Sequence, residues 1–461
     1  MTLAPGALCV PLTPRSLDEV FSSDLSGADC VEIRLDYLSN PQDSVHARWD
    51  KLPIPVIATC RGKKQGGQFD GSIEEEIRIL QYAVENGAKF VDIDYRFAQP
   101  IPGADVIASF HDFESTPADL ASLMDRVCES PGQIAKVATM VKSWSDNRRL
   151  LDLLARRSPK PLIVAGMGDI GQITRVIGPG RGSFLTYAGL TADASAPGQL
   201  TLREMTDVYR FHRARRETTL IGIVGYPVRH SLSPNIHNRA FEAFNLDFMY
   251  LKLPTPDVKD FFDNARGIGI CGFSVTLPHK TSVIAFLDEV APEALQIGAV
   301  NTVSSRDGKW VGDNTDVHGV KAALASIGFD PSGKTIVILG AGGAAKAAVA
   351  AVTGAKNVAV LSRRQILEAA NYRCDLLINA TPVGMFPMVD EAPLQGPIPA
   401  DVVFDMVYNP PITRLLSSAR DQGKTVIQGT TMFLAQAARQ FEIWTGHRAP
   451  SEIFEEKTVL S

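Results

Sequence analysis

The chain has 461 residues, which is too long for one ordinary hydrophobic core, so its length predicts two or three domains. Hydrophobic residues make up 45% and charged residues 21%, as in globular proteins, and the net charge of −5 disfavours broad binding to nucleic acid or to an anionic membrane. No apolar run reaches the ~20 residues of a membrane helix, so we expect no membrane association and a cytoplasmic location. Six scattered cysteines lack the paired spacing of a zinc site, and we expect buried free thiols and no metal.

Eight short apolar runs recur through the first half, and helix-like stretches such as 73–86 and 117–129 fill most gaps between them. Strands that alternate with helices predict a parallel sheet, and eight such units predict a closed (β/α)8 barrel. The runs are Leu8–Leu12, Val31–Leu35, Val56–Thr59, Phe90–Asp94, Val106–Phe110, Ile134–Val137, Leu162–Ala165 and Phe184–Tyr187.

Lys136 lies inside the sixth apolar run, where a charged side chain is costly unless it is paired or functional. It is therefore either a salt-bridged lysine or an amine that forms a Schiff base with a ketone. Such an amine must lose its proton, and desolvation together with the nearby cations of Arg34 and Arg61 would lower its pKa. His111 follows the fifth run directly and is the candidate for proton transfer. With Arg175 in the same predicted barrel mouth, three arginines indicate an anionic substrate such as a carboxylate.

Six motifs of this half resemble type I 3-dehydroquinate dehydratase, in order and with fitting spacing. They are Glu32-Ile-Arg34-Leu-Asp36, Ala58-Thr-Cys-Arg61, Ser109-Phe-His111-Asp-Phe, Lys136-Val-Ala, Thr174-Arg175 and Ser195-Ala-Pro-Gly-Gln199. The resemblance implies that Lys136 forms the imine and His111 is the general acid and base as 3-dehydroquinate loses water to give 3-dehydroshikimate. It also implies substrate contacts from Glu32, Arg34, Arg61, Arg175, Ser195 and Gln199. Gln65 departs from the pattern, since the family often has glutamate there.

The barrel pattern ends near Phe211, and the charged run 210–217 forms a predicted linker before a new apolar strand, Leu220–Val224. We expect the barrel at residues 1–217, an α/β substrate-binding domain at 218–325 and a Rossmann-type domain at 326–461. Its last helix, Phe433–Thr445, is expected to pack back on the substrate-binding domain.

The strand Thr335–Leu339 runs into a glycine-rich segment, 340–344, and then an alanine-rich helix. Glycines between a strand and a helix either permit tight packing or let a pyrophosphate approach backbone N–H groups at the helix N-terminus. A second strand, Asn357–Leu361, follows at Rossmann spacing, and Ser362 with two arginines comes next. Arginines in place of an acidic residue favour a 2′-phosphate and hence NADP, unless they only form a solvated turn.

Lys280 and Asp316 are the candidate catalytic pair of the second half. A lysine and a carboxylate can protonate a ketone oxygen as a hydride arrives and accept the proton in the reverse direction. The same residue types also form ordinary surface ion pairs.

Seven motifs from Leu220 onward resemble shikimate dehydrogenase. They are Gly225-Tyr-Pro-Val-Arg-His-Ser231-Leu-Ser233-Pro, Val275-Thr276-Leu-Pro-His-Lys280, Gly298-Ala-Val-Asn301-Thr, Asn314-Thr-Asp316, Asn379-Ala-Thr-Pro-Val-Gly-Met385, Asp405-Met-Val-Tyr408 and Gln436. The resemblance implies catalysis by Lys280 and Asp316, and shikimate contacts from Ser231, Ser233, Thr276, Asn301, Tyr408 and Gln436. The implied NADP contacts are Gly340, Ala341, Gly342, Gly343, Ala344, Ser362, Arg363, Arg364, Asn379, Thr381, Met406 and Gly429. The stretch between Arg364 and Asp375 is shorter than in the family, by enough for one strand and one helix.

These patterns predict a bifunctional enzyme that makes 3-dehydroshikimate in its barrel and reduces it to shikimate with NADPH in its second half. Two alternatives stay open from the sequence. One is an NAD-dependent quinate/shikimate dehydrogenase fused to a dehydratase, and the other is a barrel that only senses a ligand. The expected partners are these small molecules, and homo-oligomerisation is left open.

Overall fold

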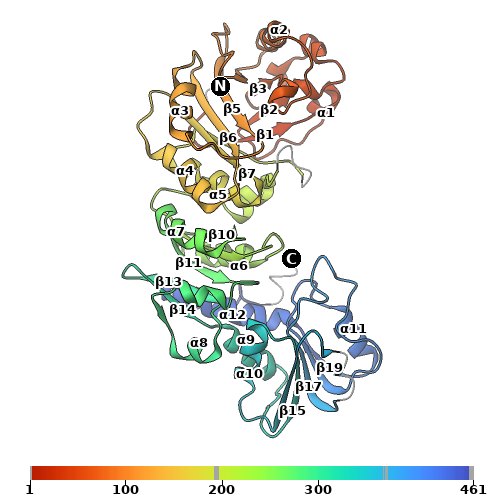
Figure 1. The fold of residues 1–461 in the computed structure, drawn as a ribbon. Helices are drawn as coiled ribbons and strands as arrows, with labels where there is room; N and C mark the ends of the chain where they lie inside the picture. Colours follow the sequence, from red (N-terminus) through yellow and green to blue (C-terminus); the bar gives the residue numbers. More distant parts are fainter. Residues whose placement is uncertain (1–2, 192–196, 367, 369–371, 456–461) are drawn as a thin grey trace. The chain divides into compact units, whose positions relative to one another are not determined.

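The computed structural model describes residues 3–191, 197–366, 368 and 372–455. The chain divides into two compact units, one of residues 1–219 with 259–269 and one of residues 220–258 with 270–461 (Figure 1). Among the helices of the described ranges, none is long and apolar enough to cross a membrane. Of the six cysteines, Cys9, Cys30, Cys60 and Cys374 are buried, whereas Cys128 is half-buried and Cys271 is exposed, so uniformly buried thiols were a wrong expectation.

The first unit is built on an eight-stranded parallel sheet in the order β7-β6-β5-β4-β3-β2-β1-β8. β1 pairs with both β2 and β8, and a bridge between Leu162 and Ser183 brings the two ends of the sheet together. The predicted eight-stranded barrel is therefore confirmed. The strands are β1 (Ala7–Leu12), β2 (Cys30–Arg34), β3 (Val56–Thr59), β4 (Phe90–Asp94), β5 (Asp105–Asp112), β6 (Ile134–Met140), β7 (Leu162–Met167) and β8 (Leu185–Tyr187).

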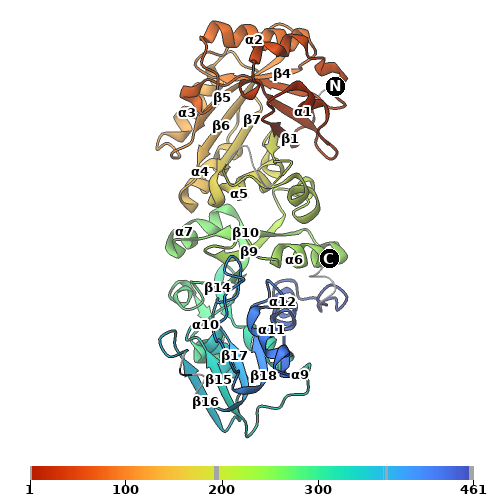
Figure 2. The ribbon, with the colours of Figure 1, turned by 90° about the vertical axis from the view of Figure 1, so that its right-hand side faces the viewer.

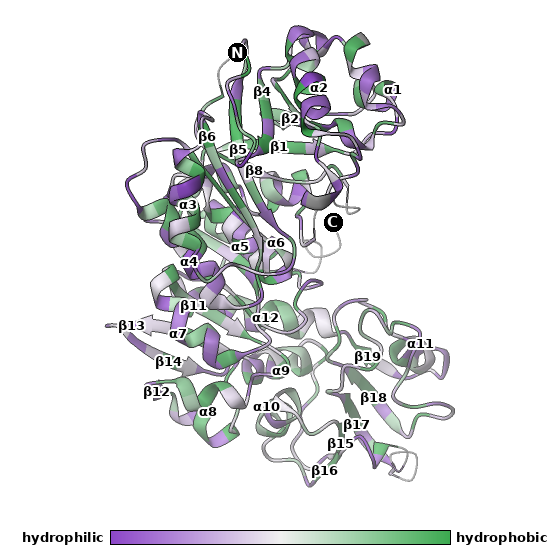
Figure 3. Cartoon of the chain, turned by 45° about the horizontal axis from the view of Figure 1, so that its top comes forward, coloured by the Kyte–Doolittle hydropathy of each residue, from purple (hydrophilic) through white to green (hydrophobic). Residues whose placement is uncertain are grey.

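Helices surround this sheet in Figure 1, and they are α1 (Leu17–Phe21), α2 (Ile73–Glu85), α3 (Leu120–Glu129), α4 (Trp144–Ala155) and α5 (Gly168–Ile177). α2 begins at a capping box in which the Ser72 side chain accepts from the backbone N–H of Glu75 and the Glu75 side chain accepts from that of Ser72. Its sequence carries both hydrophilic and hydrophobic residues (Figure 3), as expected of a helix with one face on the sheet and one in solvent.

The barrel interior is filled in layers because alternate residues of a strand point to the same side. One layer is apolar and takes a residue from every strand, including Cys30, Ile57, Phe90, Ile107 and Ile134. Two residues further along these same five strands, the inward positions are all polar. They are Glu32, Thr59, Asp92, Ser109 and Lys136, and all are buried. The strand register therefore places a layer of polar side chains next to a layer of apolar side chains inside the barrel.

The second unit contains two sheets, which Figures 1 and 2 show. The six-stranded sheet has the order β10-β9-β11-β13-β14-β12, and the five-stranded parallel sheet has the order β16-β15-β17-β18-β19. The strands of the first are β9 (Thr219–Gly225), β10 (Phe248–Pro254), β11 (Ile270–Val275), β12 (Glu289–Val290), β13 (Thr302–Arg306) and β14 (Lys309–Asp313). Those of the second are β15 (Thr335–Leu339), β16 (Asn357–Leu361), β17 (Cys374–Asn379), β18 (Ala400–Asp405) and β19 (Thr425–Ile427).

The helices of this part of the chain include α12, which begins four residues before the predicted start of the last helix and packs against both α9 and α6. They are α6 (Ser233–Ala243), α8 (Pro292–Ile297), α9 (Asp316–Ala325), α10 (Gly343–Ala351), α11 (Arg414–Asp421) and α12 (Gly429–Thr445). The helix α7 (Val258–Ile268) belongs to the first unit from residue 259 onward.

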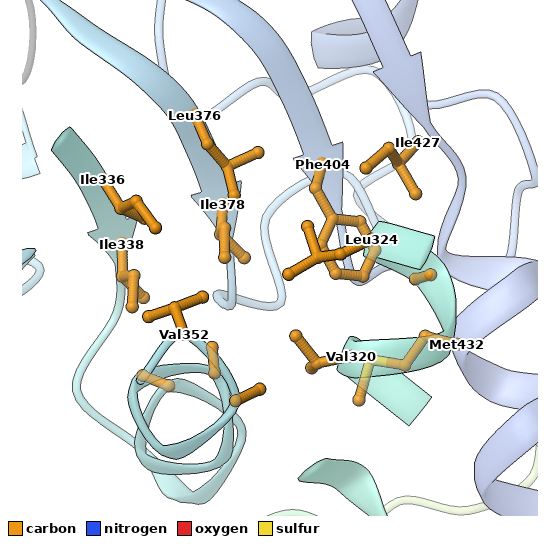
Figure 4. Close-up of a cluster of buried hydrophobic side chains, with 14 residues drawn as sticks. Val320, Leu324, Ile336, Ile338, Val352, Leu376, Ile378, Phe404, Ile427 and Met432 are labelled. Atoms are coloured by element: carbon orange, nitrogen blue, oxygen red, sulfur yellow. The ribbon is translucent and has the colours of Figure 1, made fainter. Parts of the chain in front are cut away.

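The core of the five-stranded sheet joins its central strands to three helices (Figure 4). Ile338 of β15, Ile378 of β17 and Phe404 of β18 face Val320 of α9 and Val352, which follows the last residue of α10, and all five side chains are almost fully buried. β16 lies at the edge of this sheet, and the described residues between β16 and β17 contain no further strand. This agrees with the shortened Rossmann unit expected from the sequence.

Candidate active sites

Lys136 lies in the polar layer of the barrel and is 3% exposed. Its Nζ donates a hydrogen bond to Asp92 Oδ2 at 2.7 Å, and Glu32 Oε2 lies 3.9 Å away. The Tyr187 ring centre lies 4.4 Å from Nζ, within the range of a cation–π contact. The lysine is thus paired, as one sequence alternative required, yet it also lines a cavity, as the other required.

Asp92 connects this lysine to the other cation of the layer. Its Oδ1 accepts from Arg61 NH2 at 2.8 Å and from Ser109 Oγ at 2.7 Å. Burial alone would raise the pKa of Asp92, but the charges of Lys136 and Arg61 hold it well below its usual range. The carboxylate is therefore ionised at neutral pH. No role was predicted for Asp92 from the sequence, although a carboxylate inside the apolar run Phe90–Asp94 is a usable signal.

His111 lies within β5, which extends past the predicted apolar run. Its Nδ1 is 2.6 Å from Arg61 NH1. A guanidinium only donates hydrogen bonds, so Nδ1 is the acceptor and the ring hydrogen of the neutral imidazole is on Nε2. Burial, together with the Arg61 and Lys136 charges, lowers the pKa of His111 well below its ordinary value. The resting imidazole is consequently neutral.

Arg175 is 2% exposed, and among the described residues its NH1 has no hydrogen-bond partner. Burial lowers the pKa of Arg175 to about 10, which still leaves it charged at neutral pH. Arg34 differs, because its guanidinium makes two hydrogen bonds to Asp36 at 2.9 and 2.8 Å. An unpartnered cationic N–H group beside a cavity is a ready site for an anionic ligand.

The cavity beside Lys136 has a volume of about 70 Å³ and brings together most of the predicted barrel residues. Its lining includes Glu32, Arg34, Arg61, His111, Lys136, Arg175 and Gln199. Ser195 lies outside the described residues. Gln65, on the short 3-10 helix Lys63–Gln65, is half-buried and is not part of the described lining. The described contacts of His111 are the hydrogen bond with Arg61 and the stacked ring of Phe113.

In the second unit, Lys280 follows β11 and Asp316 is the first residue of α9. Lys280 Nζ donates to Asp316 Oδ2 at 2.5 Å, and Asp316 Oδ1 accepts from Asn301 Nδ2 at 2.8 Å. A carboxylate at a helix N-terminus is stabilised by the helix dipole. The Lys280 side chain is 17% exposed and that of Asp316 is 5% exposed, so this is no ordinary surface pair.

Asn301 connects the catalytic pair to neighbouring polar groups. Its Nδ2 lies 3.0 Å from Thr315 Oγ1 and 3.4 Å from Gln436 Oε1, while its Oδ1 accepts from the Thr315 backbone N–H at 2.7 Å. The amide is thereby fixed in one orientation, with its donor group toward Asp316.

A cleft of about 590 Å³ runs between the two sheets of this unit. On one side it is lined by the predicted substrate residues Ser233, Thr276, Lys280, Asn301, Asp316, Tyr408 and Gln436. Ser231 is just behind this wall, and its Oγ accepts from the Ser233 backbone N–H at 3.3 Å. Tyr408 stacks on Phe433 with ring centres 4.1 Å apart, which fixes the direction of its hydroxyl.

The opposite wall carries most of the predicted cofactor residues, namely Gly340, Ala341, Gly342, Gly343, Ala344, Arg363, Thr381, Met406 and Gly429. A side chain at Gly342 would meet nothing within 4 Å, so the backbone at the start of α10 is open to an approaching anion. Arg363 and Arg364 are exposed cations after β16. These residues fit a dinucleotide with an additional phosphate.

Three predicted cofactor residues do not line the cleft in the described part of the unit: Ser362, Arg364 and Asn379. The Ser362 hydroxyl donates to Gln365 Oε1 at 2.7 Å. Asn379 is fully buried, donates to Asp405 Oδ1 at 2.9 Å and accepts from the Thr381 hydroxyl at 2.7 Å. Its position supports Thr381, which does reach the cleft.

The chain is similar in sequence to known proteins over both units. Family models match at residues 8–216 (Type I 3-dehydroquinase), 223–303 (Shikimate dehydrogenase substrate binding domain) and 429–457 (Shikimate 5'-dehydrogenase C-terminal domain). The chain is 36% identical to the chloroplastic bifunctional 3-dehydroquinate dehydratase/shikimate dehydrogenase of Arabidopsis thaliana, over 98% of this chain and 84% of that protein. It is 40% identical to the shikimate dehydrogenase (NADP(+)) of Methanopyrus kandleri, over 53% of this chain and 96% of that protein. A crystal structure of shikimate 5-dehydrogenase from Thermus thermophilus with NADP(H) and shikimate is 31% identical, covers 52% of this chain and 98% of its own, and has a TM-score of 0.46.

Proposed function

This chain belongs to the family of bifunctional 3-dehydroquinate dehydratases/shikimate dehydrogenases, and from that premise we propose that it carries out two consecutive reactions. The first unit dehydrates 3-dehydroquinate, and the second reduces 3-dehydroshikimate to shikimate with NADPH. The observation that carries the proposal is that each unit pairs a lysine with a carboxylate beside a cavity, Lys136 with Asp92 and Lys280 with Asp316.

In the barrel, the Lys136 amine attacks the substrate ketone, and the carbonyl oxygen leaves as water to form an imine. The imine acidifies the neighbouring C–H bond. A base takes that proton, the hydroxyl group one carbon further leaves as water, and hydrolysis of the imine restores the amine. Asp92 holds Nζ in place, and the unpartnered NH1 of Arg175 suits the substrate carboxylate.

His111 is the group that moves protons in this scheme, and its neutral state suits a base. In the resting site, however, Arg61 holds the Nδ1 lone pair, and Nε2 carries the hydrogen. For Nε2 to accept a proton from the substrate, the ring hydrogen must first be on Nδ1. Arg61 must therefore release Nδ1. Arg61 lines the same cavity, so a polar group of the bound substrate that accepts from its guanidinium would free the base.

In the second unit, the glycine-rich segment 340–344 and Arg363 would hold NADPH, and the chemistry that it would supply there is hydride transfer to the substrate ketone. Lys280 donates a proton to the ketone oxygen as the hydride arrives, and Asp316 keeps its Nζ in position. Ser231, Ser233 and Tyr408 would hold the substrate carboxylate. Asn301 and Gln436 would contact the ring hydroxyls and so select shikimate.

A coupled assay tests the two assignments together. With 3-dehydroquinate and NADPH, the intact chain should consume NADPH. Lys136→Ala should block only the first step and so still reduce added 3-dehydroshikimate, whereas Lys280→Ala should accumulate 3-dehydroshikimate. Borohydride with 3-dehydroquinate should add substrate mass to a peptide that contains Lys136.

Each alternative has its own outcome in these experiments. If no borohydride adduct forms and the intact chain does not convert 3-dehydroquinate, the barrel is a ligand-sensing module and the dehydratase assignment is wrong. A clear preference for NADH over NADPH, with turnover of quinate, would instead support the NAD-dependent dehydrogenase. A cytoplasmic location also belongs to this proposal, and cell fractionation tests it against the chloroplastic location of the Arabidopsis relative.

A further inference from the structure

Gly343, the first residue of α10, lies directly against the catalytic lysine of the other sheet. A side-chain Cβ at this position would lie 2.8 Å from Lys280 Cβ, which is closer than real Cβ atoms approach, and 3.2 Å from Lys280 Cδ, which is a tight contact. Its neighbour Gly342 has nothing within 4 Å of the same position. Two adjacent glycines of one loop therefore face different surroundings, one open and one closed.

Further contacts join the first turn of α10 to residues 298 and 299. Lys346 Nζ donates to the backbone oxygen of Gly298 at 3.1 Å, and a Cβ at Gly343 would also contact Ala299 at 3.5 Å. The next residue, Val300, donates its backbone N–H to the Lys280 carbonyl at 2.8 Å. The start of α10 is thus bound to the same short segment that is bound to the catalytic lysine.

Lys280 is consequently restrained at both ends of its side chain. Its stem lies on the Gly343 backbone, and its Nζ is hydrogen-bonded to Asp316. A free lysine side chain has four rotatable bonds and many rotamers, and fixing them in the correct geometry lowers the barrier for proton transfer.

We propose that Gly343 is a positioning residue for Lys280, in addition to its place in the cofactor loop. The open face at Gly342 receives the phosphates of the dinucleotide, and the closed face at Gly343 forms the wall that directs the lysine toward the ketone oxygen. The same helix start therefore couples cofactor binding to placement of the proton donor. This inference rests on the proposed dehydrogenase activity of the second unit.

The test compares Gly343→Ala with Gly342→Ala in the full chain. Gly343→Ala should displace the lysine stem and lower kcat for 3-dehydroshikimate reduction by about 10- to 100-fold, with an altered pH profile of kcat. NADPH affinity, measured by fluorescence titration without substrate, should change by less than about threefold. Gly342→Ala should weaken NADPH binding as its main defect, and any loss of kcat at saturating NADPH should be smaller than in Gly343→Ala.

Lys346→Met provides a second variant that removes only the contact to Gly298, since Lys346 is half-buried and lies outside the core. Lys346→Met should lower kcat, as Gly343→Ala does, but only by about two- to tenfold, and it should leave NADPH affinity unchanged. Wild-type kcat and pH profile in both Gly343→Ala and Lys346→Met would overturn the proposal. So would a Gly343→Ala variant whose only defect is NADPH affinity. Failure of the proposed function would look different, because the unmodified chain would then not reduce 3-dehydroshikimate.

Discussion

Asp92→Asn isolates the charge of the carboxylate that Lys136 and Arg61 share, because the two side chains have nearly the same shape. Asp92 is 1% exposed and accepts three hydrogen bonds at 2.7 to 2.8 Å, two of them from cations. In the asparagine side chain an NH2 group replaces one carboxylate oxygen. This NH2 group donates hydrogen bonds and would face a donor that the oxygen accepts from in the wild type. The nearest other carboxylate to Lys136 Nζ is Glu32, at 3.9 Å, beyond hydrogen-bonding distance.

Removal of one partner from a buried ion pair leaves an uncompensated charge and costs about 3 to 5 kcal/mol. The free energy of unfolding of the first unit should fall by that amount. The assay is urea unfolding followed by hydrogen exchange and mass spectrometry of peptides from β3 to β6. This readout is specific to one unit, which matters because multi-domain chains do not unfold in a single step.

The matched control is Asp50→Asn. Asp50 accepts two hydrogen bonds from Arg48 at 2.9 and 2.7 Å, but the two side chains are 47% and 59% exposed, so water and salt screen the pair. This variant should leave the unfolding free energy nearly unchanged. If Asp92→Asn cost no more than the control, the Asp92 carboxylate would not be the electrostatic centre of the barrel site.

The lowered pKa of Asp92 also predicts how the unfolding free energy depends on pH. Because the pKa of Asp92 is lower in the folded than in the unfolded chain, its stabilisation is present above the unfolded pKa of about 4 and is lost as the pH falls toward the folded pKa. The difference between the wild type and Asp92→Asn should therefore shrink below about pH 4. A difference that grew on acidification would have the wrong sign.

Two other variants probe buried groups elsewhere in the chain. Burial raises the pKa of Glu76 on α2 to about 7, so the contribution of this group to the unfolding free energy of the wild type should decline from about pH 4 to pH 7. Glu76→Gln should remove that decline, on the order of 3 kcal/mol, in urea unfolding at several pH values. A parallel decline in the variant would contradict the assignment. Phe404→Ala should lower the unfolding free energy of the second unit by about 3 to 5 kcal/mol, because Phe404 is fully buried in the core shown in Figure 4. The control is Val349→Ala, which should change the unfolding free energy little because Val349 is 40% exposed.

The extent of sequence-based prediction differs between elements and sites. Four predicted strands have the same bounds in the structure, because each is a short run rich in apolar residues with polar residues or glycine nearby: Val56–Thr59, Phe90–Asp94, Thr335–Leu339 and Asn357–Leu361. The helix expected at 117–129 begins only at Leu120, and β5 continues two residues beyond Phe110. Both differences arise at element ends, where local periodicity no longer decides the backbone conformation.

The motifs placed the candidate residues on the correct elements but left their partners undefined. Lys136 was expected beside arginines, yet its nearest group is the Asp92 carboxylate, which is 44 positions away in the sequence. That pairing depends on the register between neighbouring strands, which a single strand's pattern does not contain.

The amino-acid sequence by itself determined the eight barrel strands and the shortened segment after β16, because each follows from a pattern that is local in the chain, and its motifs predicted the two sets of site residues. The tertiary structure alone decided that Asp92 joins Lys136 to Arg61, that Arg61 fixes the hydrogen of His111 on Nε2, and that Gly343 supports Lys280. Each of these is a contact of a few ångströms between distant segments. Such contacts are set by strand register and by the packing of one sheet's helix on another sheet's loop, and so they exist only once the whole unit has folded.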